Sequence, residues 1–177
     1  FDRKSGFDQL VVVEHAALGS LHDLLSRGFS FTTEQRVRIA GAAAAGLAYL
    51  HAGAFATPMP HGRFTRHKVL VDGGLQARVS GFGLPSLKRR QRAEWLADDG
   101  NALHAAPEML LGGDETTAGD VYSWSMVTYG LFHPGQALFV AEDPSEAIPH
   151  ILSGALRPLL HAPARAASSL SASSLSG

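Results

Sequence analysis

Residues 61–83 read HGRFTRHKVLVDGGLQARVSGFG, a basic polar loop followed by two short apolar runs and a phenylalanine between two glycines. The runs 69–71 and 76–79 flank Asp72-Gly73-Gly74. A turn sequence of this kind between β-branched residues predicts a β-hairpin. The hairpin would separate two polar segments, His61 to Lys68 before it and Gly81-Phe82-Gly83 after it.

A long helix is predicted upstream of this hairpin. Thr32, with Gln35 three residues later, forms a capping box, and the helical pattern continues to His51. Gly41 and Gly46 lie inside it, where each costs up to about 1 kcal/mol relative to alanine. Their presence indicates close packing against a neighbour, or simple tolerance.

The remaining elements follow from short local signals. The run 9–14 is β-branched and apolar and predicts a buried strand, and Ser20 is a suitable N-cap for a short helix at 21–25. A polar loop is expected from 83 to 105 and a short helix at 145–152. Thr117 and Asp120 form a capping-box-like pair before another helix, one face of which carries Val121, Trp124, Val127 and Leu131.

Composition excludes several classes of protein. The 177 residues are 45% apolar and 18% charged, a globular composition for a single domain or part of one. Lys and Arg number 15 against 16 Asp and Glu, which argues against a dedicated nucleic-acid binder or a polybasic membrane clamp. Cysteine is absent, which excludes disulfides and thiol nucleophiles. The longest apolar run, 39–50, is too short to span a bilayer.

The order of these segments resembles the C-terminal lobe of a protein kinase of the tyrosine-kinase-like group, over roughly residues 8–160. The resemblance implies an α+β, mainly helical fold, with a last N-lobe strand and hinge at 1–15, a C-lobe at 16–160 and a disordered Ala/Ser-rich tail at 161–177. The segments that carry it are Leu10 to His15, Gly19 to Leu25, Gly46 to His51, Ala106-Pro107-Glu108 and Asp120 to Trp124.

The catalytic positions of the family are replaced in this chain. In the kinase pattern H-R-D-L-x-x-x-N the Asp is the base and the Asn holds Mg²⁺, and the Asp of D-F-G holds Mg²⁺ as well. Matched residue by residue, Arg63 stands for the Asp, Thr65 for a phosphate-contacting Lys, Lys68 for the Asn and Gly81 for the second Asp. These changes make the cleft more positive by three charges. Ordinary Mg²⁺-dependent phosphoryl transfer is therefore not expected.

Other positions keep the structural part of the pattern. By resemblance, His61 is the structural histidine of the loop, Phe82 and Gly83 complete the D-F-G-like turn, and Ala106-Pro107-Glu108 ends the activation segment. Asp120 corresponds to the residue that anchors the catalytic loop, or serves only as a helix N-terminal acid. No arginine could be matched to pair with Glu108.

Two basic clusters leave alternatives open. The first cluster consists of Arg63, Arg66 and Lys68. One interpretation is an anion pocket that takes metal-free ATP or a phosphorylated partner, and the other is a set of solvated cations with no ligand. The second cluster is the run Lys88 to Arg92. It is interpreted either as a docking site for an acidic partner or a membrane surface, or as a solvated loop whose positive charge is balanced by the acidic residues that follow. Between Leu87 and Ala105 no hydroxyl is available for activation-loop phosphorylation.

A metal site is not predicted from histidine spacing. The nine histidines show no H-E-x-x-H or H-x-x-E-H pattern, and no G-x-S-x-G elbow marks a hydrolase. No resident cofactor is predicted.

Three functions remain open. The first is a degenerate kinase-like domain that acts as a signalling scaffold by binding a protein partner or an adjoining domain. The second is a fragment of an active kinase whose N-lobe is missing. The third is a truncated non-functional product. An intracellular location is implied by the resemblance alone.

Overall fold

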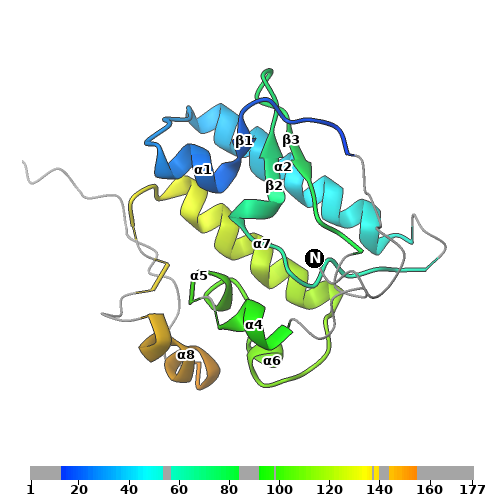
Figure 1. Cartoon of the computed structure of the whole chain (residues 1–177), viewed down its shortest axis with the longest axis vertical. Helices are drawn as coiled ribbons and strands as arrows, with labels where there is room; N and C mark the ends of the chain where they lie inside the picture. Colours follow the sequence, from blue (N-terminus) through cyan, green and yellow to red (C-terminus); the bar gives the residue numbers. More distant parts are fainter. Residues whose placement is uncertain are drawn as a thin grey trace, which may run out of the picture.

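The computed structural model describes residues 13–53, 57–83, 92–97, 99–136, 138–139 and 144–154. Its fold is mainly helical with one small sheet, as the sequence predicted (Figure 1). The longer helices are α1 (Leu21–Ser26), α2 (Thr33–His51), α7 (Thr117–Phe132) and α8 (Pro144–Leu152). Short helices are η1 (Arg66–Lys68), α4 (Arg92–Leu96), α5 (Asp99–Ala102) and α6 (Pro107–Leu110), and the strands are β1 (Gly19–Ser20), β2 (Val69–Val71) and β3 (Ala77–Val79).

The frame of the molecule is the pair α2 and α7, which run side by side across its centre (Figure 1). The indole Nε1 of Trp124 on α7 donates to the carbonyl of Ala40 on α2, at 3.0 Å. One turn nearer the start of α2, Arg36 Nη1 donates to the carbonyl of Phe132 at the end of α7, at 3.1 Å. Buried side chains of both helices face the same core, so the pair forms one rigid support for the loop between α2 and β2.

Polar caps fix where the helices begin. Thr32 and Gln35 form the predicted capping box of α2, and Ser20 caps α1 together with Asp23. The cap expected at Thr117 is wrong. Thr116 caps α7 instead, its hydroxyl accepting from Gly119 N at 2.9 Å. Asp120 is therefore not used in a capping box and is available for other donors.

The sheet has the order β1-β2-β3 and is antiparallel throughout. The predicted hairpin is confirmed, with Val69 opposite Val79. Of the strand expected at 9–14, residues 9–12 lie outside the described residues, and Val13 and Glu14 belong to no strand. The loop expected from 83 to 105 is wrong in part, because α4 and α5 lie within it. The run 88–91 and the tail 161–177 lie outside the described residues.

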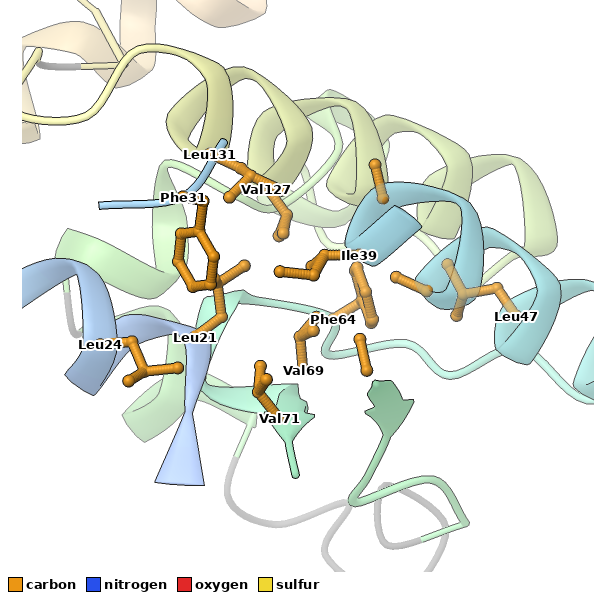
Figure 2. Close-up of a cluster of buried hydrophobic side chains, with 13 residues drawn as sticks. Leu21, Leu24, Phe31, Ile39, Leu47, Phe64, Val69, Val71, Val127 and Leu131 are labelled. Carbon is orange, nitrogen blue, oxygen red and sulfur yellow. The ribbon is translucent and has the colours of Figure 1, made fainter. Parts of the chain in front are cut away.

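The main core lies between the sheet, α1, α2 and α7 (Figure 2). Phe64, at the centre of the loop that precedes η1, is fully buried in it among Ile39, Val69 and Leu131. The face predicted for α7 is correct for Val127 and Leu131, whereas Val121 is 58% exposed. The loop is thus held by its own aromatic side chain against the helix pair.

The two glycines within α2 differ. A Cβ on Gly46 would lie 2.6 Å from Val79 Cγ2, so α2 and β3 approach closely there. At Gly41 nothing lies within 4 Å. Of the two interpretations given above, close packing applies to Gly46 and tolerance to Gly41. In the described part of the chain, no helix has the length and apolar character needed to cross a membrane.

Candidate functional site

One buried carboxylate on α7 anchors the backbone of the loop 61–65 through hydrogen bonds. Asp120, 1% exposed, accepts from the backbone N–H of His61 at 2.6 Å and from that of Gly62 at 2.8 Å. Its Oδ2 also lies 2.7 Å from Nε2 of His51, at the end of α2. A single side chain therefore joins α2, α7 and the start of the loop.

His61 is a buried structural side chain in a defined tautomer. Its Nε2 donates to the carbonyl of Ser80 at 2.9 Å, and its Nδ1 accepts from Arg63 N at 3.3 Å. The ring also meets Phe64 edge-on, with centroids 5.5 Å apart. Burial lowers the pKa of His61, so the neutral ring is favoured. His61 thereby ties the loop to the segment that follows β3.

Arg63, which sequence analysis matched to the family's catalytic Asp, is only 9% exposed. Its Nε lies 3.9 Å from Glu115 Oε1, and its guanidinium carbon lies 5.9 Å from the centre of the Trp95 ring. The ion pair and the cation–π contact reach across to the segments before and after α6. This position therefore acts as a structural link between the loop and the activation segment.

Gly62 makes room for that link. Its φ is +75°, which favours glycine, and the carboxylate of Glu115 occupies the place where a Cβ would lie. Gly62, Arg63 and Glu115 thus form one interdependent group. Sequence analysis did not identify Glu115 or Trp95, because neither belongs to a motif that names its partner.

Lys68 lies against Gly81, so the two positions that sequence analysis matched to the family's metal ligands are neighbours. A Cβ on Gly81, where φ is +76°, would lie 3.2 Å from Lys68 Cδ and 3.4 Å from its Nζ. The backbone holds this approach, because Ser80 N donates to the carbonyl of Lys68 at 2.8 Å. A fixed positive charge beside Gly81 opposes a divalent cation at this place.

The three cations of the predicted anion pocket contact different neighbours. Arg63 faces Glu115 and Trp95, whereas Lys68 lies beside Gly81. Arg66 reaches α7, where its Cδ and Nη1 would lie 3.7 Å from a Cβ on residue 130, and burial lowers the pKa of its guanidinium. Thr65 is buried, and its hydroxyl finds no partner among the described residues.

Local hydrogen bonds hold the chain around α6, at the predicted end of the activation segment. Ala106 precedes α6, which begins at Pro107, and Glu108 is exposed while its carbonyl accepts from Gly113 N at 2.7 Å. Phe82 is 41% exposed, and Gly83 has a φ of +73°. Their assignment to the family's D-F-G-like turn and to the end of its activation segment stays a prediction.

His104 is a buried titratable group that sequence analysis assigned no role. It is 3% exposed, and its Nδ1 donates to the carbonyl of Gly100 at 2.6 Å. Burial, the largest cause, lowers its pKa to about 4. Its Nε2 is buried without a hydrogen-bond partner among the described residues. The ring is therefore neutral, and its hydrogen bond holds it against α5.

Comparison with known proteins extends the similarity over most of the chain. The family model for protein tyrosine and serine/threonine kinases matches residues 4–171. A G-type lectin S-receptor-like serine/threonine-protein kinase, SD2-2 of Arabidopsis thaliana, is 35% identical over 138 residues, 76% of this chain and 17% of that protein. The probable serine/threonine-protein kinase PBL6 of the same plant is 34% identical over 128 residues, 69% of this chain and 30% of that protein. The chain thus spans less than a third of the length of either relative.

Proposed function

Because this chain belongs to the protein tyrosine and serine/threonine kinase family, we propose that it is a catalytically inactive member that acts in signalling by binding a protein partner or an adjoining domain. The observation that carries the proposal is the position of Arg63. A general base must be free to accept a proton from the substrate hydroxyl, whereas this side chain is a permanent cation held between Glu115 and Trp95.

The electrostatics of the loop support the same proposal. Phosphoryl transfer depends mainly on positioning and on Mg²⁺. Lys68 places a positive charge beside Gly81, where the family pattern has carboxylate and amide oxygens. A site that repels Mg²⁺ loses the largest contribution to lowering the barrier. An intracellular location is part of the proposal and is inferred from the resemblance alone.

A second function is favoured by the intact anchoring of the loop. Asp120 and His61 still hold the loop backbone, as an active family member would need. The chain would then be part of an active ATP-dependent kinase that uses other metal ligands. A truncated product with no function is the third alternative, and it predicts no cooperative unfolding transition for the chain.

Phosphoryl transfer is the direct test. The chain is extended with a complete N-terminal lobe and incubated with radiolabelled ATP, Mg²⁺ and a general protein substrate. We expect no transfer above background. Transfer should appear only when Arg63→Asp, Lys68→Asn and Gly81→Asp are combined with Glu115→Gln, which removes the carboxylate that would repel the new aspartate. Turnover by the unsubstituted chain, abolished by EDTA, would refute the proposal.

Nucleotide binding distinguishes the remaining alternatives. Thermal melts of the chain with millimolar ATP are run with Mg²⁺ and again with EDTA. A ligand at 100 times its Kd adds about 2.7 kcal/mol of stability, which shifts a melt visibly. A shift that survives EDTA indicates metal-free ATP at the basic loop, and a shift that requires Mg²⁺ favours the active kinase. A cooperative melt without a shift favours a scaffold that binds no nucleotide.

A further inference from the structure

Two histidines far apart in the sequence meet at the junction of α1 and η1. The rings of His22 and His67 are stacked, with centroids 3.9 Å apart and planes inclined by 25°. Asp23 follows His22 on α1. One ligand atom from each of these three side chains lies within 4.8 Å of the other two. We propose that His22, Asp23 and His67 bind one Zn²⁺ ion that links α1 to the degenerate loop.

The donor set matches the chemistry of this ion. Imidazole nitrogen is a borderline ligand that suits Zn²⁺, and Zn²⁺ also accepts carboxylate oxygen, whereas Mg²⁺ and Ca²⁺ prefer oxygen ligands alone. Three protein ligands leave the fourth tetrahedral position to water. Zn–N and Zn–O bonds of about 2.0–2.2 Å require the three donors to close in slightly. The stacked imidazoles must also rotate so that one nitrogen of each faces the ion, and Asp23 and His67 are exposed, which leaves room for that movement.

Neighbouring hydroxyls already orient the ligands. Ser20 donates to Asp23 Oδ2 from its Oγ at 2.7 Å and from its N–H at 3.4 Å, which leaves Oδ1 for a cation. The hydroxyl of Ser26 lies 3.3 Å from Nε2 of His22. Such outer contacts favour one direction of a ligand before the metal binds.

The charge state of the cluster suits a cation. The Ser20 hydrogen bonds lower the pKa of Asp23, so its carboxylate is ionised. Burial and the neighbouring His22 lower the pKa of His67, which favours the neutral imidazole that binds metals. The adjacent Arg66 and Lys68 also lower the pKa of His67, but their side chains extend away from it, Arg66 onto α7 and Lys68 to Gly81. The spacing of histidines along the chain could not reveal this cluster, because the fold brings its two parts together.

The test is a Zn²⁺ titration of the full 177-residue chain after treatment with EDTA, in competition with a chelating dye. We expect one Zn²⁺ per chain. His22→Gln and His67→Gln should each weaken binding at least tenfold, and His150→Gln, an exposed histidine on α8, should leave it unchanged. Equal affinity in all four proteins, an equal loss in His150→Gln, or no stoichiometric binding would overturn the proposal.

A second measurement uses the unsubstituted chain. The imidazole resonances of His22 and His67 should shift together and reach a plateau at one equivalent of Zn²⁺. Shifts confined to other histidines would overturn the proposal. Neither measurement involves ATP or phosphoryl transfer, so the result is independent of the function proposed above.

Discussion

Replacing Asp120 by asparagine should cost about 2–4 kcal/mol of unfolding free energy. Asparagine keeps the shape, and its carbonyl oxygen can still accept from Gly62 N. The amide nitrogen that replaces Oδ2 would face the N–H of His61, now 2.6 Å from an acceptor. A buried donor without an acceptor costs about 1–3 kcal/mol, and the loss of charge from the remaining bonds adds about 1 kcal/mol.

The assay is urea denaturation at pH 7, followed by circular dichroism. Asp114→Asn is the matched control, because Asp114 is exposed and the same change there should stay within about 0.5 kcal/mol. Amide hydrogen exchange should also become faster at His61 and Gly62 in the Asp120 variant. If the two variants are equally stable and hydrogen exchange at His61 and Gly62 is unchanged, Asp120 does not anchor the loop.

Three further predictions concern single side chains. Gly46→Ala should destabilise the fold by about 0.5–2 kcal/mol in urea melts, since a clash with β3 outweighs the better helix propensity, whereas Gly41→Ala should stabilise it by up to about 1 kcal/mol; the reverse order would contradict the packing. His104, with its pKa lowered to about 4, is neutral when folded but binds a proton when unfolded below about pH 6.5, so stability is lost as the pH falls. Urea melts at pH 7.5 and 5 should show a loss from this group of about 2 kcal/mol, absent in His104→Gln; an equal loss in both would show that another group titrates. Gly62→Ala should lower the unfolding free energy by at least about 1 kcal/mol more than Gly112→Ala in thermal melts. Both glycines have positive φ, but only at Gly62 is the Cβ position already filled, by Glu115. An equal loss in both variants would mean that backbone strain alone accounts for the effect and that the contact with Glu115 does not matter.

The elements that sequence analysis predicted correctly are those with local signals. Caps at Ser20 and Thr32 and the turn at 72–74 depend on residues within a few positions of each other. Helices α4 and α5 are shorter than two turns, so periodicity cannot reveal them. The error at Val121 has a related cause: periodicity defines a stripe along a helix, but the extent of the neighbouring core decides how much of it is buried.

The candidate site divides in the same way. The replacements at Arg63, Lys68 and Gly81 could be identified from their order in a motif. Their contacts could not, because the partners of Arg63 come from segments beyond the hairpin. The stacked pair His22 and His67 was hidden for the same reason. Long-range pairs of this kind carry no period or spacing, and only the folded chain shows them.

The link formed by Gly62, Arg63 and Glu115 has an evolutionary consequence. Replacing Arg63 by aspartate would place a second carboxylate near that of Glu115, and the burial of position 63 would strengthen their repulsion. It would also remove the cation that stacks on Trp95. This variant would be less stable and, with Lys68 and Gly81 unchanged, would still lack the metal ligands of the family pattern. Selection would therefore not favour it. Glu115 would have to change first, so a single substitution at position 63 could not introduce an aspartate there without this loss of stability.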